Sequence, residues 1–429
     1  MKPPIIEVQK HHKEHHHCVP FEHVTLRVHH PKASRVVVRD GAGRTYIDTA
    51  VRPGAPLRFT VRGSAGRQQI DAHNARGSVV ASATLLLKPH TALHCTGGPY
   101  AALAERIARL MELYHETHSL KVGERIYRML ICWTRDHVHT LKAWKYYMHD
   151  VFSGLDYWLD RQTKNGMFWD CIYPNETYPG RTFQGAVLGK GWYMYEDGGK
   201  WLVRRVPVLA DTEFIITEGV YYAWKASGDD AWMARQLPRL EKALRYNTAD
   251  PKRWSKKWGL VKRSFCMDGW DFANPHFCKG DHRVIHKGDP QFLFHGDNSG
   301  VYASFWRMAE MYEHLGNRTR AKALRAEGEA LRRRANKKLF FDNAYGHMIP
   351  ESMDERALYA LVGDERRRMS LSTGYTLTRK LPTHDMAVRV LDEYRRRGAA
   401  ARHESFAEWW TMDPPYTSAQ WPQRGTGGS

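Results

Sequence analysis

The spacing of apolar residues along the chain changes from short runs to a helical period near residue 97. Before this point, apolar or β-branched runs are separated by turn signals such as Asp40-Gly41. The runs cover residues 24–28, 36–38, 57–61 and 79–87. Short strands at this spacing are typical of a β-sandwich. We therefore expect a small β-sandwich domain over residues 21–96, preceded by a His-rich tail over residues 1–20.

Beyond this region, apolar residues recur with the period of an α-helix. Leu103, Ile107 and Leu110 share one face of the first expected helix. Further helices are expected over residues 141–161, 213–226, 231–246, 299–315, 318–338, 352–362 and 383–396. Two long loops, residues 164–210 and 250–297, are rich in Trp, Gly, Asp and Pro. Loops of this length in a compact domain commonly carry function.

Helical hairpins joined by alternating short and long loops favour a mainly α fold. We predict an (α/α)6 toroid over residues 97–429, with its long loops gathered at one mouth. No repeat of fixed period is visible, which disfavours a solenoid. The pattern supports about eight to ten helices rather than the twelve of a complete toroid. The prediction therefore includes a toroid that is incomplete at its C-terminal end.

Composition excludes several classes of protein. The chain has 429 residues, of which 42% are hydrophobic and 12% aromatic. These fractions exclude a disordered chain and a coiled coil. The sequence contains no run of about 18 apolar residues, so it predicts no membrane span. The net charge is +19, from 65 Lys+Arg against 46 Asp+Glu, and it raises nucleic-acid binding as an alternative.

The expected location is the cytoplasm. Residues 1–20 are charged and His-rich and contain no apolar stretch that resembles a signal peptide. The six cysteines are scattered and form no CxxC pair. Reduced thiols are therefore the simplest expectation.

The first segment that could carry chemistry is Trp133-Thr134-Arg135-Asp136, at the start of an expected helix. An aromatic ring can contact the C–H face of a sugar, and charged side chains can hydrogen-bond its vicinal hydroxyls. Trp133, Arg135 and Asp136 are therefore candidate substrate-binding residues. The alternative is structural: Asp136 caps the helix and pairs with Arg135.

The second segment, Asp268 to Phe272, lies in a long loop and brings two carboxylates close to aromatic residues. A general acid for a glycosidic oxygen needs a raised pKa, and an apolar environment raises it. Asp271 is the candidate acid, and Asp268 and Trp270 are candidate binding residues. A turn in which Asp268 bonds the nearby backbone is the structural alternative.

Two further segments place carboxylates at expected helix starts. Asp211 and Glu213 precede or begin one helix, with Glu218 one turn further on, and Asp297 lies in a polar turn before another. Asp211, Glu213 and Asp297 are candidate substrate-binding residues. Helix caps and dipole-stabilising carboxylates are the alternative.

The last segment is rich in aromatic residues near the C-terminal end. Glu408 is followed by Trp409 and Trp410, as expected for a base that activates water beside a sugar. Glu404 competes with Glu408 for this role, and either residue could instead be a solvated helix charge. Trp409 is a candidate wall of the site.

We expect no metal and no cofactor. Cys278, His282 and His286 have ligand-type side chains at helical spacing, which zinc could use. No fourth ligand accompanies them, and neighbouring Pro and Gly argue against a helix there. The His-rich run at residues 11–17 is expected to be a solvated tail.

Taken together, these motifs resemble the six-hairpin glycosidases over about residues 97–425. The Trp133–Asp136 segment is similar to the sugar-binding segment of glucoamylases. Gly269-Trp270-Asp271-Phe272 resembles the trehalase motif that contains the general acid, and the stretch from Asp297 through Glu351 resembles trehalases and glycogen-debranching enzymes. After Phe272 the sequence departs from the trehalase signature, so trehalose is not assigned as the substrate.

The resemblance implies an inverting glycoside hydrolase that acts on an oligo- or polysaccharide. Asp271 would protonate the leaving oxygen, and Glu408 would activate water about 6.5–9.5 Å away. Asp268 is the substitute for Asp271, and Glu213 the substitute for Glu408. Trp133, Arg135 and Asp136 would hold the terminal sugar, with Trp270 and Trp409 as side walls.

Two alternative functions remain open. A polysaccharide lyase, uronyl hydrolase or sugar epimerase could use the same toroid, and an acidic glycan would suit the positive charge. A non-catalytic carbohydrate- or nucleic-acid-binding protein is the second alternative. The Arg clusters at residues 332–334, 366–368 and 395–397 are expected on solvated helix faces, and no nucleic-acid-binding motif accompanies them. We therefore expect a carbohydrate partner and neither nucleic acid nor membrane; the oligomeric state is not predicted.

Overall fold

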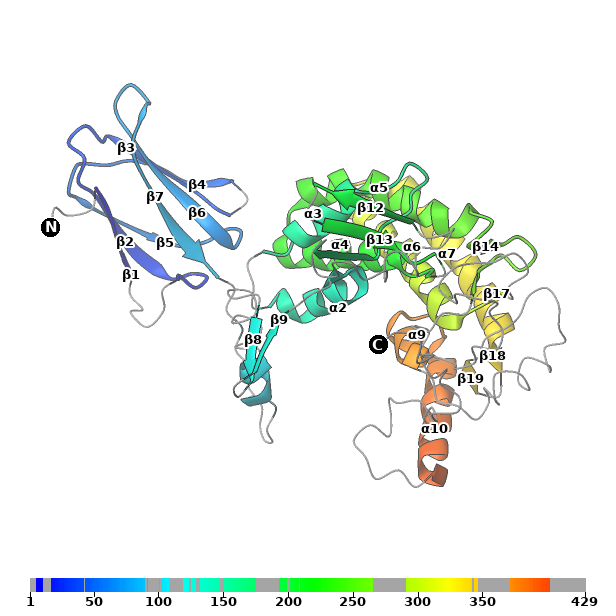
Figure 1. Ribbon diagram of the computed structural model, residues 1–429. Coiled ribbons are helices and arrows are strands. Elements are labelled where there is room, and N and C mark those ends of the chain that lie inside the picture. The colour runs from blue at the N-terminus through cyan, green and yellow to red at the C-terminus, as the bar shows by residue number, and fades with distance from the viewer. Residues whose placement is uncertain are drawn as a thin grey trace. The chain divides into compact units, whose positions relative to one another are not determined.

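The computed structural model describes most of the chain, and Figure 1 shows its elements. The described residues are 5–10, 17–41, 43–88, 91, 100, 102–107, 119–122, 125–128, 132–146, 150–174, 193–198, 201–207, 209–264, 291–341, 343–345 and 371–401. They divide between two compact units. The first comprises Met1–Met129, His139–Asp156 and Tyr222–Trp232, and the second comprises Leu130–Val138, Tyr157–Tyr221 and Met233–Ser429. The domain boundary expected near residue 97 stays a prediction.

Up to residue 88, the first unit contains two antiparallel sheets. One sheet has the strand order β1-β2-β5, and the other has the order β4-β3-β6-β7. Their strands are β1 (Ile6–Lys10), β2 (His23–Val28), β3 (Arg35–Arg39), β4 (Thr45–Ala50), β5 (Pro56–Thr60), β6 (Gly66–His73) and β7 (Val79–Leu87). The four strands expected from the sequence correspond to β2, β3, β5 and β7. The other three were missed because polar residues fill many of their positions.

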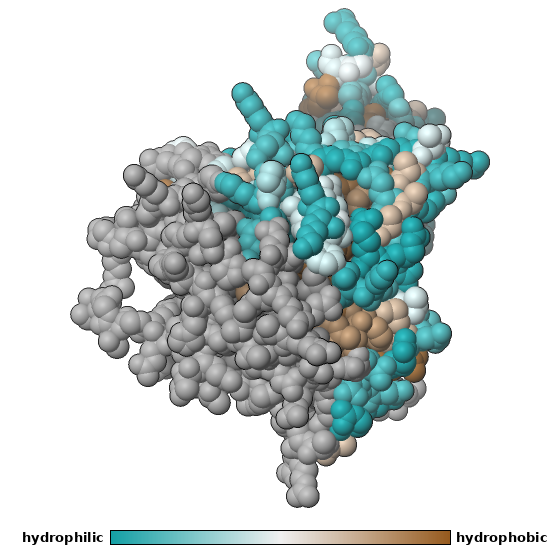
Figure 2. Space-filling view, turned by 90° about the vertical axis from the view of Figure 1, so that its right-hand side faces the viewer, coloured by the Kyte–Doolittle hydropathy of each residue, from teal (hydrophilic) through white to brown (hydrophobic). Residues whose placement is uncertain are grey.

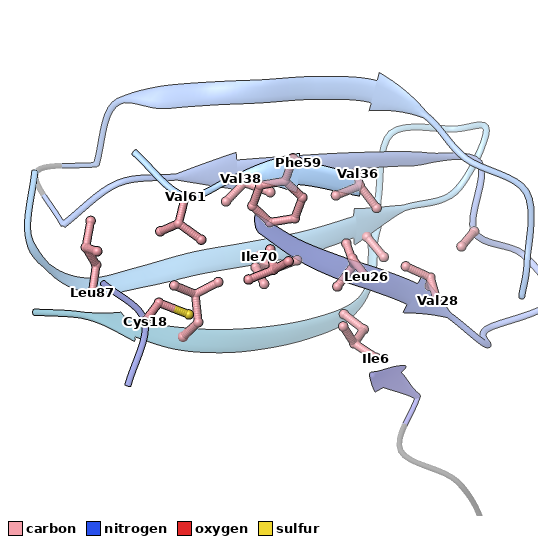
Figure 3. Packing of buried hydrophobic residues seen from close by; sticks show 14 residues of the cluster. Ile6, Cys18, Leu26, Val28, Val36, Val38, Phe59, Val61, Ile70 and Leu87 are labelled. Atoms are coloured by element: carbon pink, nitrogen blue, oxygen red, sulfur yellow. The ribbon is translucent and has the colours of Figure 1, made fainter. Parts of the chain in front are cut away.

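One hydrophobic core is shared by the two sheets (Figure 3). Leu26, Phe59 and Ile70 alternate along their strands with polar residues, so their side chains face this core, as does that of Val38. Cys18 also lies in the core, where burial raises the pKa of its thiol to about 11. A β-layered unit is therefore present, as the apolar runs indicated.

The N-terminal tail expected over residues 1–20 is in part ordered structure. Residues Ile6–Lys10 form β1, which pairs antiparallel with β2. Ile6 belongs to the shared core and Val8 packs against it, because apolar and polar residues alternate there. Near the other end of the segment, the Cys18 backbone N–H donates to the Leu86 carbonyl at 2.8 Å. Part of the segment 1–20, which was expected to be a His-rich tail, therefore contributes a strand to the sheet, while residues 11–16 lie outside the described residues.

The helix expected over residues 141–161 is wrong, because two helices occupy this region. They are α2 (Thr134–Trp144) and α3 (Ser153–Asp160). Asp150 Oδ1 accepts hydrogen bonds from the backbone N–H groups of Phe152 and Ser153. These hydrogen bonds satisfy backbone N–H groups at the start of α3, so a second helix begins there. Elsewhere, β8 (Ser119–Val122) and β9 (Arg125–Arg128) form a hairpin, and residues 102–107 are helical.

The second unit contains a small antiparallel sheet with the order β10-β11-β13-β12. Its strands are β10 (Cys132–Trp133), β11 (Cys171–Pro174), β12 (Tyr193–Asp197) and β13 (Trp201–Arg205). Three of the four lie within the stretch 164–210, which was expected to be a loop. β13 escaped the sequence analysis because Arg204 and Arg205 occupy buried positions of the strand, where the pattern calls for apolar residues.

Helices make up most of the rest of the described chain. They are α4 (Thr212–Ser227), α5 (Asp230–Ala249), α6 (His295–His314), α7 (Arg318–Leu339), α9 (Leu371–Thr378) and α10 (His384–Ala401). Short strand pairs lie between them: β14 (Trp254–Ser255) with β15 (Leu260–Val261), β16 (Arg263–Ser264) with β17 (Gln291–Phe292), and β18 (Phe340–Phe341) with β19 (Ala344–Tyr345). The expected helices for α4, α5, α7 and α10 are close to those found, and α9 was not expected. The helix expected over residues 352–362 lies outside the described residues.

Helices α6 and α7 form a hairpin with a tight turn. Gly316 adopts φ +83°, a left-handed conformation that favours glycine after a helix C-terminus. The Asn317 side chain then accepts a hydrogen bond from the Arg320 N–H at 3.1 Å and caps α7. Helical hairpins are the unit of the expected toroid, but the toroid itself stays a prediction. Among the described helices, none is long and apolar enough to cross a membrane.

The outer faces of these helices carry paired charges. Arg320 forms an ion pair with Glu241 at 2.6 Å, and Arg325 forms one with Glu313. Figure 2 shows one face of the molecule, on which the described residues are mostly hydrophilic. Part of the positive charge of the chain is therefore an exposed, ion-paired surface property.

Helices α4 and α6 pack so closely that one position admits only glycine. A Cβ atom added to Gly300 in α6 would lie 2.3 Å from the ring of Phe214 in α4. Because Phe214 is itself buried, the ring has little room to move.

We predict that Gly300→Ala destabilises the protein by about 1–3 kcal/mol, the usual cost of overpacking. Helix propensity alone would give the opposite sign, a gain of about 1 kcal/mol. Urea denaturation measures the difference, with Ala326→Ser as a control because Ala326 is exposed on α7. A more stable Gly300→Ala variant would contradict the close packing.

Candidate functional site

The start of α2 is held firmly against β11. The Thr134 backbone N–H donates to the Asp170 carbonyl at 2.8 Å, and its Oγ1 donates to the Trp169 carbonyl at 2.9 Å. Thr134 is buried. Its two neighbours in sequence, Trp133 and Arg135, are therefore held in fixed positions at the end of the sheet.

Arg135 forms an ion pair with Asp211, 76 positions away in the chain. Its Nε and Nη2 lie 2.6 and 2.5 Å from the same oxygen, Asp211 Oδ2. The exposed fractions of the two side chains are 30% and 13%, so the pair reaches the surface of its unit. Among the described residues, none donates a hydrogen bond to Asp211 Oδ1. This oxygen can therefore accept a hydrogen bond from a ligand.

Asp211 also starts helix α4. Its carbonyl accepts the first intrahelical hydrogen bond, from Ile215 N–H at 2.9 Å, which defines the N-cap position. Its carboxylate is used by Arg135 instead of the helix. Burial acts to raise the pKa of Asp211, but the nearby guanidinium groups of Arg135 and Arg263 outweigh burial and lower it. Asp211 is therefore ionised at neutral pH.

Trp133 lies two positions before Arg135, at the end of β10. The ring is partly buried, and the Arg204 guanidinium carbon lies 4.9 Å from the ring centroid. This contact is a cation–π interaction. In the described part of the chain, no residue accepts a hydrogen bond from the Trp133 indole N–H. The ring is thus fixed from one side and keeps a donor for a ligand.

Asp136 is exposed in the first turn of α2. At this position a carboxylate interacts favourably with the helix dipole. Its charge acts together with burial to raise the pKa of Cys132 to about 11. The sequence analysis gave a pair between Arg135 and its neighbour Asp136 as the structural alternative. In the structure, Arg135 pairs with Asp211 instead.

Glu213 is buried and holds the local structure together. Its Oε1 accepts the Phe168 N–H at 3.0 Å, and its Oε2 lies 3.1 Å from Nη2 of Arg205. Arg205 also donates to the carbonyls of Phe168 and Leu209. The exposed fractions of the two side chains are 1% and 0%. With both oxygens engaged and no access to solvent, Glu213 has the surroundings of a structural residue rather than of a base that activates water.

Asp297 lies in the first turn of α6, which begins four residues earlier than expected. Its Oδ2 lies 3.0 Å from Nε of Arg263 on β16, and both side chains are almost fully buried. The Arg263 guanidinium lies over the ring of Phe294, 4.2 Å from its centroid. The polar turn that the sequence indicated is therefore a helix start held by a buried ion pair.

A second buried group links α4, α6 and α9. Glu218 lies 3.0 Å from Nη2 of Arg307 and 3.5 Å from Nη2 of Arg379. All three side chains are at least nine-tenths buried. Burial lowers the pKa of Arg379, and Arg307 adds to this effect, whereas Glu218 opposes it. Glu218, which was considered for the mouth of the site, is thus an internal counter-ion.

Asp170 is a buried carboxyl group that the sequence analysis did not single out. Its Oδ1 accepts the Val206 N–H at 3.1 Å, while its Oδ2 has no hydrogen-bond partner among the described residues. Burial raises the pKa of Asp170 to about 6, even though Arg204 and Arg205 lower it. No motif could have revealed it, because a single Asp before a strand carries no pattern.

The charges of this region nearly balance. Five carboxylates, those of Asp170, Asp211, Glu213, Glu218 and Asp297, face six guanidinium groups. The latter belong to Arg135, Arg204, Arg205, Arg263, Arg307 and Arg379. Because most of these groups are buried, each charge needs a partner within its own unit. Among the described residues, Asp136 at the start of α2 adds a sixth carboxylate.

The predicted catalytic pair lies outside the described residues. This holds for Asp271 and Glu408, and equally for Asp268, Trp270 and Trp409. Their roles stay predictions. Of the six described candidates, the structure joins Arg135 to Asp211, places Trp133 and Asp136 on either side of Arg135 in the chain, and buries Glu213 and Asp297.

Among the described residues, no group of three His, Cys, Asp or Glu side chains could hold a metal ion. Cys278, His282 and His286 lie outside the described residues.

The chain was also compared with known proteins. No protein-family model and no curated protein matches the sequence. Among solved structures, the chain is similar to a rhamnosidase from Klebsiella oxytoca with rhamnose bound (TM-score 0.43, 9% identity, 88% of this chain and 72% of that chain). It is also similar to a GH63 mannosylglycerate hydrolase from Thermus thermophilus (0.41, 14%, 64% and 72%) and to a sugar epimerase from a ruminal bacterium (0.39, 10%, 75% and 75%).

Because every TM-score lies below 0.5, the activity proposed below is derived from the residues of this chain.

We predict a distinct pH dependence of stability from Asp170. Its pKa is about 6 in the folded chain and about 3.9 in the unfolded chain, so the folded state holds the proton more tightly. The free energy of unfolding therefore falls as pH rises from about 4 to 6, by about 3 kcal/mol from this group alone. Urea denaturation at several pH values should show this slope, and Asp170→Asn should remove it.

Asp160→Asn is the matched control, because Asp160 is exposed and pairs with Arg239 at the surface. An Asp170→Asn variant with the same pH slope as the unmodified protein would disprove the raised pKa.

Proposed function

We propose that the protein is a glycoside hydrolase that acts on an oligo- or polysaccharide by an inverting mechanism. The observation that carries this proposal is the Arg135–Asp211 ion pair, which joins two candidate residues that are distant in the chain, with Trp133 two positions before Arg135. Because no described residue binds Asp211 Oδ1 or the Trp133 indole N–H, we infer that these groups and the aromatic ring serve a ligand. A ring surface next to a charged donor–acceptor pair is what binding of a sugar requires, since a sugar offers C–H groups on its face and hydroxyls at its edge.

In this proposal, the terminal sugar lies against Trp133, and one of its hydroxyls donates to Asp211 Oδ1. Arg135 holds the carboxylate in place and keeps it ionised, because its positive charge lowers the pKa of Asp211. Asp136 contributes a further acceptor at the exposed start of α2. The buried Glu213 and Asp297 act through structure, by holding α4 and α6 in position.

The chemical step is assigned to Asp271 and Glu408, on the sequence motifs that contain them. Asp271 donates a proton to the glycosidic oxygen as the bond from this oxygen to the anomeric carbon breaks. Glu408 removes a proton from a water molecule whose oxygen attacks the anomeric carbon from the opposite face. One water is consumed, and the configuration at the anomeric carbon is inverted. Asp268 and Trp270 line the acid, and Trp409 forms a wall beside the base.

The remaining expectations belong to the same proposal. We propose that the helical hairpins form an (α/α)6 toroid, preceded by a β-sandwich over residues 21–96. We also propose a cytoplasmic location. A carbohydrate is the expected partner.

A second function on the same fold is favoured by one observation. The net charge of the chain is +19, and a positive charge suits an acidic glycan. A polysaccharide lyase, uronyl hydrolase or sugar epimerase is therefore the alternative. A screen of neutral and uronic-acid oligosaccharides separates a lyase from a hydrolase. A lyase forms an unsaturated product and consumes no water, whereas a hydrolase consumes one water and forms no double bond.

The decisive experiment is hydrolysis of a panel of aryl glycosides and oligosaccharides, with the product anomer read by NMR. We expect the first product to have the inverted configuration. Asp271→Asn and Glu408→Gln should each lower kcat by at least about 100-fold, because general acid–base catalysis contributes about 10²–10⁴.

Asp268→Asn and Glu404→Gln test the competing assignments: a larger loss of kcat in either variant than in Asp271→Asn or Glu408→Gln would move the role to that residue. Full activity in Asp271→Asn would overturn the assignment of the acid, and a retained anomer would overturn the inverting mechanism.

Substrate binding is tested at the described part of the site. We predict that Arg135→Met raises KM about 10- to 100-fold, because a charge-assisted hydrogen bond contributes about 1.5–3 kcal/mol. Arg325→Met, which breaks an exposed ion pair on α7, should leave KM unchanged. An unchanged KM in Arg135→Met would place the sugar site elsewhere.

A further inference from the structure

The C-terminal half of α7 and the β14–β15 hairpin together form a strongly basic surface. Residues 330–338 of α7 contain five basic and no acidic residues, and residues 252–263 contain six basic and no acidic residues. The two segments touch, because Nε of Arg334 donates to the Gly259 carbonyl at 2.9 Å. Positive charges from both segments therefore gather at one place in the second unit.

Trp258 lies where the two segments meet. The ammonium group of Lys338 lies 4.2 Å from the centroid of its ring, and that of Lys257 lies 5.2 Å from it. Both contacts are cation–π interactions, and they hold the two ammonium groups beside the ring. We call the following residues the basic patch: Lys256, Lys257, Trp258, Arg333, Arg334, Lys337 and Lys338.

The next residue, Gly259, permits this arrangement. It adopts φ +60°, and an added Cβ atom would lie 2.6 Å from Nε of Arg334. A side chain at this position would therefore separate the hairpin from α7.

The arginines at residues 332–334 were expected on a solvated helix face, but only Arg333 is exposed. Arg332 donates to the Leu381 and Pro382 carbonyls, and Arg334 is held by the hairpin. Three lysines of the patch are exposed or partly exposed beside Arg333, and two of them, Lys256 and Lys337, are in the exposed class. The patch thus presents charged groups to solvent from both segments.

The two halves of α7 differ in how their charges are balanced. In the N-terminal half, Arg320 pairs with Glu241 at 2.6 Å and Arg325 pairs with Glu313. In the described part of the chain, no carboxylate forms an ion pair with five residues of the patch: Lys256, Lys257, Arg333, Arg334 and Lys337. Burial lowers the pKa of Arg334, and the charge of Arg333 adds to this effect. The patch therefore carries an excess of positive charge, which a polyanion would neutralise.

The surroundings of the patch distinguish between polyanions. Single-stranded nucleic acids bind by stacking bases on aromatic rings, but ammonium groups already contact the ring of Trp258. A helix that reads duplex DNA enters the major groove, whereas the hairpin lies against α7 at Gly259. In residues 252–263 and 330–338, all of which the structure describes, no large hydrophobic side chain is exposed for insertion into a membrane. An acidic polysaccharide needs only charged donors for its anionic groups.

We propose that the basic patch binds an acidic polysaccharide and is a second binding surface, separate from the candidate site at Arg135 and Asp211. Lys257, held beside Trp258, and the exposed Arg333 donate to successive anionic groups of the chain. The choice of a glycan over a nucleic acid rests in part on the proposed function, whereas the basic patch does not.

The proposal is tested by fluorescence anisotropy with fluorescein-labelled hexagalacturonate as the probe. We expect Lys257→Gln combined with Arg333→Gln to raise Kd about 5- to 20-fold, because each exposed charge pair contributes a few-fold to affinity. The loss of affinity with rising salt should also become less steep, since fewer bound ions are displaced. Lys257→Arg combined with Arg333→Lys keeps both charges and should bind nearly as well as the unmodified protein.

Arg318→Gln combined with Lys322→Gln is the matched control. It removes one Arg and one Lys from exposed positions of the same helix, about 15–20 Å from Arg333 along the axis. Its Kd should stay nearly unchanged, and circular dichroism shows that each variant is folded. An unchanged Kd in the patch variant, or an equal loss in the patch variant and the control, would overturn the proposal.

Three further probes test the choice of partner: a DNA duplex, vesicles with anionic lipid, and a neutral hexasaccharide. Tighter binding of any of these than of hexagalacturonate, lost in the patch variant, would overturn the assignment to an acidic glycan. Loss of hexagalacturonate binding in Arg135→Met rather than in the patch variant would place the anion at the candidate site and overturn the second surface. Binding is measured without turnover, so a protein that hydrolyses no glycoside would refute the proposed function while this test still decides the role of the patch.

Discussion

The second unit depends on the buried ion pair between Arg205 and Glu213. Removing one partner of such a pair leaves an uncompensated charge in the interior, at a cost of about 3–5 kcal/mol. Because Arg205 also donates to the Phe168 and Leu209 carbonyls, the pair joins β13, the segment before β11 and the start of α4. Because these three segments are held together, Asp211 at the start of α4 lies within ion-pair distance of Arg135. The position of the exposed Arg135–Asp211 pair thus depends on the buried Arg205–Glu213 pair.

Glu213, Asp211 and Asp170 all carry carboxyl groups, but their different surroundings give them three different roles. Glu213 is enclosed and doubly bonded by protein donors, and it acts as a structural anchor. Asp211 is partly exposed, and no described residue binds its second oxygen, so it is fit to bind a ligand. Asp170 is enclosed but incompletely bonded, and its charge is the easiest of the three to alter near neutral pH. A list of acidic residues would not separate these roles, since the separation comes from the donors around each group.

The helical part of the fold could be predicted better than the sheets of the second unit. Helices such as α4 and α7 have a regular apolar period, so their bounds were expected to within a few residues. β13 was hidden because Arg204 and Arg205 stand at buried positions, and the break between α2 and α3 was hidden because Asp150 also looks like an ordinary surface residue of a helix. Trp133, Arg135 and Asp211 could be singled out by residue type. The pairing of Arg135 with Asp211 could not, because nothing in a sequence states which of its distant residues meet.

The contrast between exposed and enclosed ion pairs has a consequence for how the protein responds to its solvent. Pairs such as Arg325–Glu313 on α7 are open to water, and dissolved ions weaken them at moderate ionic strength. Pairs such as Arg205–Glu213 and Arg307–Glu218 are closed off, so mobile ions cannot enter to screen them. A rising salt concentration should therefore loosen the outer helix surface while the arrangement beneath the Arg135–Asp211 pair stays intact. The geometry of the candidate site is, in this sense, insulated from the ionic composition of its surroundings.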